Sequence, residues 1–542
     1  MVSDYLHHTR TEGRKTLKET VAALVLVVLA GTFLATINIQ IAKPSDLPSL
    51  EWTRTFGGSS DDGYHEVQLT KPRCGGYAIT GVTESFGAGS KDFWLIKTDE
   101  AGNMEWNQTY GGTGADWVLS IVETSDSGYV LFGHTNSFGA GNWDFWLVKT
   151  DRNGDMEWNK TYGGSGRDEG RALVQTPDGG YAMAGFTDSF GSGGLDWWLV
   201  KANSIGEMEW NRTYGTGLNE YAYALILLED GFAIAGQSGP HASSNAWLMK
   251  VDSLGNHQWD ETYGGTSSDL ALSAIRTDDG GFAMTGYTRS FESGDQDFWL
   301  VKTDETGNME WLQTYRGAKD DHARHVIQTE DDGYAILGAT SSQGVGGDDI
   351  WLVKTNSSGD AEWNQTYGGA MEDWGDSIVQ TSSGAFVLAG WTKSYGAGNT
   401  DFWLLKTASP MIQATIDIDP NGLNLRSLGQ WITVYIELPD GYDVNDIDVS
   451  TLALNNTIPV DLYMSLTIGD EDADGVLDLM VKFSRSAITA FILEVLGSPE
   501  KFTTVVVTLS GELDDGTIFE GSDTITVIYP MAGGGGRSNY PR

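Results

Sequence analysis

Short runs of apolar residues separated by Gly-rich turns recur between residues 51 and 407. In the copy spanning residues 111–162, such runs occur at 118–124, 129–133, 144–150 and 156–162. The first alternates imperfectly between apolar and polar residues, the third is apolar nearly throughout, and an Asn-Gly turn separates the last two. No segment between residues 51 and 407 keeps a 3.6-residue apolar period. The pattern therefore predicts four antiparallel strands, A to D, in each copy.

The copies repeat with a period near 50 residues. Their anchoring tryptophans are separated by 54, 52, 52, 49, 52 and 52 residues and are Trp52, Trp106, Trp158, Trp210, Trp259, Trp311 and Trp363. Four strands with their turns fill such a period, which is typical of one blade of a β-propeller. We expect an all-β chain with a seven-bladed propeller over residues 51–409, in which large aromatic side chains fill the space between blades.

The two ends of the array differ in the strand type that they contain. The array begins with a D-type strand at 51–56 and ends with a C-type strand at 401–407. Pairing of the first strand with residues 402–407 would complete the last blade and protect both sheet edges. An open solenoid is the alternative, but it requires polar capping repeats, and the terminal copies here are ordinary ones.

The segment before the array contains a membrane signal. Residues 1–19 are polar and basic, residues 20–42 are uncharged and mostly apolar with polar interruptions near their end, and residues 43–50 form a linker. The apolar length and its basic flank predict a single transmembrane anchor with a cytoplasmic N-terminus, and a cleaved signal peptide is the alternative. Both place the rest of the chain outside the cytoplasm, on the cell membrane or secreted. Cys74 is the only cysteine, so no intramolecular disulfide forms.

The composition changes after residue 410. Residues 411–530 contain alternating strands and predict a β-sandwich, with one short helical stretch at 487–496, and residues 531–542 form a Gly-rich tail that we expect to be disordered. A formal net charge of −42 argues against nucleic acid as a partner. We expect a monomeric ectodomain.

One acidic loop in this second region has the spacing of a calcium site. Carboxylates at positions 1, 3, 5 and 9 and a backbone carbonyl at position 7 can surround the ion, and Gly475 permits the sharp turn. The predicted ligands are Asp470, Asp472, Asp474, Val476 and Asp478. The loop resembles those of dockerin-like and thrombospondin-repeat proteins, but Val481 replaces the bidentate Glu of an EF-hand. We expect structural calcium; the alternative is a solvated acidic turn.

A second set of carboxylates recurs once in each repeat, between strand D of one blade and strand A of the next. It comprises Asp62, Asp116, Asp168, Glu220, Asp269, Asp321 and Asp373. Seven carboxylates around the channel mouth would bind a cation or a polyhydroxy ligand. The alternative is structural, because a repeated Asp that caps backbone amides between blades would recur in the same way.

Aromatic residues and departures from the repeat accompany this face. The B-to-C loops contain Phe86, Phe138, Phe190, Phe291 and Tyr395, which would stack on sugar rings if exposed. Histidines interrupt the repeat at His65, His322 and His325, and departures of this kind mark positions where a site could be built. The chain has no G-x-S-x-G elbow, HExxH or P-loop.

The repeat region resembles the Gly- and Trp-rich tandem-repeat propellers of microbial surface and secreted proteins, and the second region resembles β-rich modules that accompany them in archaea. Little chemistry is implied by this resemblance. From the residues we expect a membrane-anchored extracellular protein that binds a glycan or a surface protein at the channel mouth, or a cell-surface scaffold. A carbohydrate-active enzyme, a hydrolase or a lyase that uses an acidic channel mouth, is the alternative.

Overall fold

The computed structural model describes residues 48–528 apart from 65, 241–242, 292–294, 410, 428, 440–441, 471–474, 497–501 and 515. The predicted basic segment 1–19, the apolar segment 20–42 and the tail 531–542 lie outside the described residues. In the part of the chain that is described, no helix is long and apolar enough to cross a membrane.

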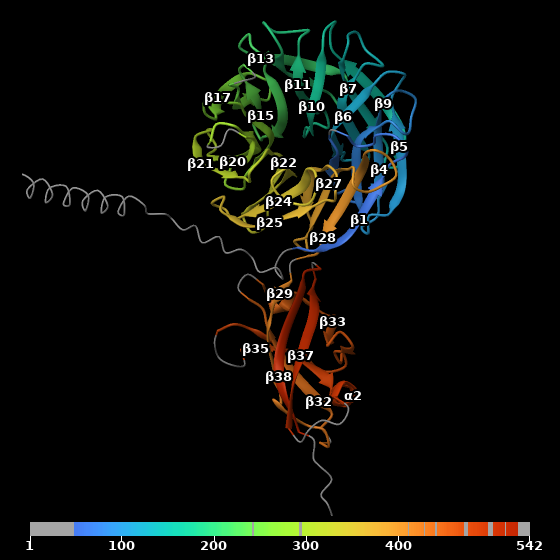
Figure 1. Ribbon diagram of the computed structural model, residues 1–542, viewed down its shortest axis with the longest axis vertical. Coiled ribbons are helices and arrows are strands. Elements are labelled where there is room, and N and C mark those ends of the chain that lie inside the picture. The colour runs from blue at the N-terminus through green and yellow to red at the C-terminus, as the bar shows by residue number, and fades with distance from the viewer. Residues whose placement is uncertain are drawn as a thin grey trace, which may run out of the picture. The chain divides into compact units, whose positions relative to one another are not determined.

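Residues 50–407, as far as they are described, form seven four-stranded antiparallel sheets. Six of them are built from four consecutive strands, so that the chain runs through A, B, C and D before it enters the next sheet. Figure 1 shows the sheets following one another around a ring, as in a β-propeller. The repeat boundaries predicted from the tryptophan spacing coincide with these sheets.

The A strands of neighbouring sheets contact one another and form the inner layer. They begin at the repeated carboxylate in five sheets, whereas the first A strand is only three residues long. The A strands are β2 (Gln68–Thr70), β6 (Asp116–Glu123), β10 (Asp168–Gln175), β14 (Tyr221–Leu227), β18 (Asp269–Arg276), β22 (Asp321–Gln328) and β26 (Asp373–Gln380).

The B strands are almost completely buried, as their continuous apolar sequences predict for sheets that are covered on both faces. They are β3 (Tyr77–Thr83), β7 (Tyr129–Thr135), β11 (Tyr181–Thr187), β15 (Gly231–Ser238), β19 (Phe282–Thr288), β23 (Tyr334–Thr340) and β27 (Phe386–Thr392).

The C strands are also buried, and they provide the aromatic contacts between sheets. Phe93 packs against Trp146 of the next C strand with ring centroids 4.5 Å apart, and Phe145 packs against Trp198 in the same way. The predicted filling of the space between blades by tryptophan is therefore observed. The C strands are β4 (Asp92–Thr98), β8 (Asp144–Thr150), β12 (Asp196–Ala202), β16 (Asn245–Asp252), β20 (Asp297–Thr303), β24 (Asp349–Thr355) and β28 (Asp401–Thr407).

The D strands form the outer edges. The predicted Asn-Gly turn before β9 is present: Gly154 has φ +81°, and a Cβ atom there would lie 2.6 Å from the Trp106 ring. In that close packing, glycine is the residue that fits. The D strands are β5 (Met104–Tyr110), β9 (Met156–Tyr162), β13 (Met208–Tyr214), β17 (His257–Tyr263), β21 (Met309–Tyr315), β25 (Ala361–Tyr367) and β1 (Leu50–Phe56).

The first strand of the array belongs to the last sheet. β1 pairs antiparallel with β28, with Leu50 opposite Thr407 and Phe56 opposite Phe402. The indole N–H of Trp403 also donates to the Thr53 hydroxyl at 2.5 Å. This pairing is the one predicted from the strand types at the two ends of the array.

The second region contains two sheets. The larger has the order β29-β38-β37-β33-β34, with β31 paired to β38, and the smaller has the order β30-β32-β36-β35. The larger comprises β29 (Ile412–Gln413), β31 (Gly422–Asn424), β33 (Ile447–Leu454), β34 (Ile458–Pro459), β37 (Phe502–Leu513) and β38 (Ile518–Ile528). The smaller comprises β30 (Thr415–Asp419), β32 (Trp431–Glu437), β35 (Thr467–Gly469) and β36 (Asp478–Ser484).

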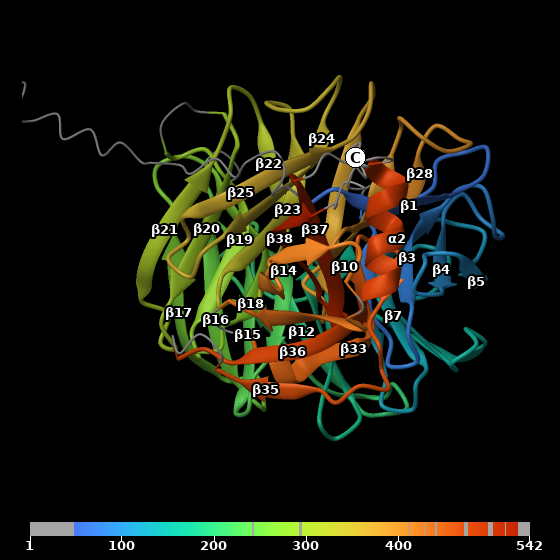
Figure 2. The same ribbon diagram turned by 90° about the horizontal axis from the view of Figure 1, so that it is seen from below.

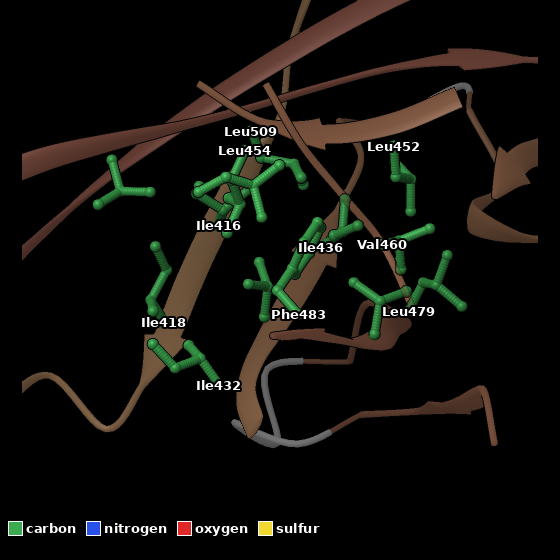
Figure 3. Packing of buried hydrophobic residues seen from close by; sticks show 14 of the residues in the cluster. Ile416, Ile418, Ile432, Ile436, Leu452, Leu454, Val460, Leu479, Phe483 and Leu509 are labelled. Atoms are coloured by element: carbon green, nitrogen blue, oxygen red, sulfur yellow. The ribbon is translucent and has the colours of Figure 1, made fainter. Parts of the chain in front are cut away.

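One hydrophobic core lies between these sheets. Figure 3 shows Ile436 and Phe483 from the smaller sheet among the same buried side chains as Leu454 and Leu509 from the larger one. The helical stretch predicted at 487–496 is α2 (Arg485–Leu496), the only α-helix among the described residues (Figure 2). A short 3-10 helix, η1 (Val444–Asp446), precedes β33.

Candidate functional site

The seven repeated carboxylates do not face the channel. None has any exposed surface, and this applies to Asp62, Asp116, Asp168, Glu220, Asp269, Asp321 and Asp373 alike. A ligand in the channel therefore has no access to them.

Hydrogen bonds account for their burial. Asp116 accepts the Thr135 hydroxyl on Oδ1, and on Oδ2 it accepts the Ser137 hydroxyl and the Gly112 N–H, both at 2.8 Å. The same three donors meet the carboxylates of Asp62, Asp168, Asp269, Asp321 and Asp373. Each Asp thus ties the D-to-A turn to strand B and the B-to-C loop, which is the structural interpretation of the repeat.

The fourth sheet departs from this arrangement. Glu220 accepts the Thr216 hydroxyl at 2.6 Å, and Ser238 occupies the strand position that carries Thr135 in the second sheet. Glu220 is nevertheless as buried as the six aspartates.

The aromatic side chains of the B-to-C loops are partly exposed but lie outside the central hollow described below. Phe86, Phe138, Phe190 and Tyr395 are 42–46% exposed, whereas Phe291 is partly buried. Each exposed ring leans on the tryptophan of its own C strand, as Phe138 does on Trp146 at 5.3 Å.

A hollow of about 630 Å³ occupies the centre of the ring of sheets. The residues that line it come from the A strands and from Glu66 before β2, from the ends of B strands at His134 and Tyr287, and from the connecting segments at Arg167, Trp143 and Gln296. It therefore lies at the face that carries the D-to-A and B-to-C loops, where the sequence predicted a functional site.

Beta-bulges direct side chains into this hollow. In each A strand from the second sheet onward, the register with strand B shifts around the third residue after the repeated carboxylate. The residue left over lines the channel, since an unpaired residue turns its side chain away from the regular alternation. These six positions, which we call the bulge ring, are Leu119, Arg171, Tyr223, Leu272, Arg324 and Asp376.

The rim of the hollow lies two residues earlier in the A strands. Trp117, Glu169, Leu270, His322 and Trp374 directly follow the repeated carboxylates and line the hollow. Sheets that are nearly identical elsewhere thus differ at the two positions that face the channel, in the rim and in the bulge ring.

Aromatic rings form two clusters at the rim. On one side, His134 stacks with Trp117 at 6.4 Å and meets the edge of Trp143 at 5.0 Å. On the other side, His322 contacts Trp374 at 5.3 Å, and Trp374 stacks on Trp391 with an interplanar angle of 7°. Aromatic rings therefore line both sides of the opening.

The rim histidines are neutral at physiological pH. Burial lowers the pKa of His134 to about 4 and that of His322 to about 4. They can donate or accept hydrogen bonds but contribute no charge near pH 7.

The charge of the hollow comes from arginine and glutamate. Arg171 donates to Glu66 and to Glu169, both at 3.4 Å, and Arg167 pairs with Glu169. Burial by itself raises the pKa of Glu169, but Arg171 and Arg167, with His134 when it is protonated, outweigh it and lower that pKa. The hollow is thus a mixed site rather than the acidic mouth that the sequence predicted.

A smaller hollow of about 190 Å³ shares several lining residues with the first and reaches Asp376 and His325. Burial raises the pKa of Asp376 to about 7, although Arg324 opposes this. His325 accepts the Ile378 N–H on Nδ1 at 3.0 Å, and burial lowers its pKa to about 4. The channel therefore contains one buried acid that is protonated below neutral pH.

Sequence reasoning found only part of this site. It marked His322 and His325 as departures from the repeat, and His65 lies outside the described residues. It missed Trp117, Glu169, Arg171 and Trp374. The signal was present, because these residues vary at fixed distances after an otherwise constant carboxylate.

The predicted calcium loop is described in part. Asp472 and Asp474 lie outside the described residues, while Asp470, Val476 and Asp478 are placed. Gly475 has φ +100°, and its N–H donates to Asp470 at 3.2 Å. Asp478 is buried at the start of β36, opposite Gly469 of β35. The described residues contain no group of three or more acidic, His or Cys side chains that could hold a metal ion.

No protein-family model matches the chain, and no curated protein matches it. Solved structures of similar architecture include PorZ, a surface component of the type-IX secretion system of Porphyromonas gingivalis, with a TM-score of 0.42, 11% identity, and coverage of 87% of this chain and 60% of PorZ. The extracellular domain of BT4673 from B. thetaiotaomicron has a TM-score of 0.39, 10% identity, and coverage of 90% of this chain and 60% of that one. BBS1N, crystallised with ARL6DN, has a TM-score of 0.40, 10% identity, and coverage of 67% and 98%. Likenesses at this level carry no argument about function.

Proposed function

We propose that this chain is an extracellular protein whose seven sheets close into a seven-bladed β-propeller and that it binds a glycan in the central hollow. The observation that carries the proposal is the variation at the rim and in the bulge ring. Repeats that are nearly identical at structural positions differ where their side chains face the hollow. A merely structural channel lining has no need for this diversity.

The composition of the hollow suits a saccharide. Trp117 and Trp374 bring aromatic rings to the hollow, against which sugar rings can pack, and Glu169, Arg171 and His322 offer donors and acceptors for hydroxyl groups. A volume of about 630 Å³ lies in the usual range of small-ligand sites and accommodates a short oligosaccharide.

The remaining parts of the proposal rest on the sequence. Residues 20–42 would anchor the protein in the membrane, or be removed so that the protein is secreted, and Asp470, Asp472, Asp474, Val476 and Asp478 would hold a structural calcium ion. A surface protein is the alternative ligand.

A glycan array with the full-length protein tests the proposal. Replacing Trp117 and Trp374 together with alanine should abolish binding of the glycans that the wild type retains. The matched control replaces Phe138 and Phe190, which are exposed aromatics outside the hollow, and should leave binding intact. Glycan binding that persists in the variant lacking Trp117 and Trp374 would contradict a glycan site in the hollow. So would binding of a surface protein with no binding of any glycan.

A carbohydrate-active enzyme is the second candidate, and Asp376 favours it. A carboxylic acid with a pKa of about 7 that lies in the same hollow as Glu66 can serve as a general acid. Reducing ends should then accumulate when the bound glycan is incubated with the wild type but not with Asp376→Asn. An intact glycan after prolonged incubation indicates binding alone.

A further inference from the structure

The first sheet contains an insertion that places a carboxylate in the channel. In the second sheet Ser120, four residues after Asp116, pairs with Phe132; at the equivalent place in the first sheet Gln68, six residues after Asp62, pairs with Thr80. The first copy is thus two residues longer at this point, which agrees with its interval of 54 residues against the usual 52. Glu66 lies in the extra segment and lines the hollow.

Glu66 meets two arginines that come from different sheets. Its Oε1 lies 3.4 Å from Nη1 of Arg171 on β10 and 3.6 Å from Nη1 of Arg324 on β22. Two guanidinium groups of the bulge ring therefore converge on one oxygen of the Glu66 carboxylate. A bidentate Arg–carboxylate pair, by contrast, has shorter contacts and uses both carboxylate oxygens.

Both arginines keep donor capacity. Their Nε atoms are buried and have no hydrogen-bond acceptor among the described residues. The side chains as a whole are 22% and 24% exposed, so a molecule in the hollow reaches parts of both side chains other than the buried Nε atoms. A guanidinium group has five N–H donors in a planar fork that matches a carboxylate, and these two forks are incompletely used.

Aromatic faces hold the two guanidinium groups in place. Arg324 lies over the Trp374 ring at 5.2 Å, and Arg171 lies over Phe186 at 5.5 Å and over Tyr223 at 5.7 Å. Trp374 is also one of the two aromatic residues proposed to contact the sugar, so a sugar packed against its ring would lie beside Arg324.

We propose that Arg171 and Arg324 form a carboxylate-binding site, that Glu66 occupies it in the free protein, and that the ligand is an acidic saccharide whose carboxylate displaces Glu66. This inference rests on the proposed glycan-binding function and narrows it to sugars that bear a carboxylate. Exchange of one carboxylate for another leaves both arginines paired, whereas a neutral glycan leaves Glu66 where it is.

The test compares acidic oligosaccharides with their methyl esters, which keep the shape and lose the charge. Isothermal titration of the full-length protein uses dimers to tetramers of glucuronate, galacturonate and mannuronate, sialyl oligosaccharides, and the ester of each. The wild type should bind at least one acid ~10-fold or more tightly than its ester. Glu66→Gln removes the internal competitor and should strengthen acid binding by ~10-fold without changing ester binding.

Arg324→Met should remove the preference for acid over ester, while Arg276→Met, an exposed arginine outside the hollow, should keep it. Misfolding cannot produce the tighter acid binding expected of Glu66→Gln. That variant therefore tests the inference even if Arg324→Met does not fold. Equal binding of acids and esters by the wild type and Glu66→Gln, or no binding of any acid, overturns the inference. If neutral glycans bind and Trp117 and Trp374 are required, the proposed function stands without it; if no glycan binds, both fail.

Discussion

At the scale of single residues, the chain uses the same side chain for opposite purposes according to burial. The repeated carboxylate before or at the start of each A strand is inaccessible to solvent and accepts hydrogen bonds from neighbouring residues, whereas Glu66 and Glu169 line the hollow beside arginines. The sequence shows that an Asp repeats but does not show whether it faces solvent. The structural role of the seven repeated carboxylates could therefore be separated from a ligand-binding role only by their burial.

Asp116→Asn should destabilise the protein. The amide has one oxygen where the carboxylate uses two, so its NH₂ group would face either the Gly112 N–H or a hydroxyl donor. Loss of a buried, charge-assisted hydrogen bond costs about 1–3 kcal/mol. Denaturant unfolding measures this loss, and Asp155→Asn, on an exposed turn, should cost nothing. Unchanged stability together with lost glycan binding would mean that Asp116 is a ligand-binding residue and not a structural one.

Asp376 should make stability depend on pH. Its pKa is about 7 in the folded protein, through burial and Glu66 against the opposing Arg324, while an unfolded Asp titrates near 3.9. Between these values the folded state holds a proton that the unfolded state has released, so this contribution to the free energy of unfolding falls as pH rises from about 4 to about 7.

Asp376→Asn does not titrate and should lose this contribution. The free energy of unfolding of the wild type minus that of the variant should therefore decrease from pH 4.5 to pH 7 and stay level above pH 8. Urea unfolding of both proteins across this range measures the difference. A difference that is independent of pH would mean that Asp376 is not a buried, titrating acid.

At the scale of elements, strand composition was the most dependable predictor. The strands predicted at 144–150 and 156–162 are β8 and β9 without a shift, and the pairing of β1 with β28 followed from strand types alone. These elements are set by local apolar pattern and turn residues. The bulge ring was missed, because an extra residue in a strand is defined by its register with the neighbouring strand. Its trace in the sequence is the variation at a fixed distance after the repeated carboxylate, which becomes apparent only when the copies are compared with one another.

Calcium should stabilise the region containing residues 411–530. A ligand that binds only the folded form adds about 2.7 kcal/mol at 100 times its Kd, which raises the melting temperature by several degrees. Melting with calcium and with a chelator measures the effect. Asp472→Ala should remove it, and Asp514→Ala, an exposed carboxylate elsewhere in the region, should not. Identical curves for the wild type in both conditions would rule out the site.

At the scale of the whole molecule, repetition explains the fold and its interruption locates the site. The copies agree at Asp116 and its equivalents, at the C-strand aromatics and at the turn glycines, which hold sheets together. They disagree at the rim, in the bulge ring and in the two-residue insertion before β2. The expected acidic mouth was wrong in charge because it rested on conserved spacing, whereas the channel is lined by the positions that vary.

A crystal structure of the full-length protein with the saccharide that binds most tightly is the most direct test of this account. We predict electron density for sugar rings in the hollow between Trp117 and Trp374, with an acidic group of the saccharide between Arg171 and Arg324 and Glu66 moved aside. Sugar density against the loop aromatics Phe138 and Phe190, or in the region of residues 411–530 with an empty hollow, would contradict it.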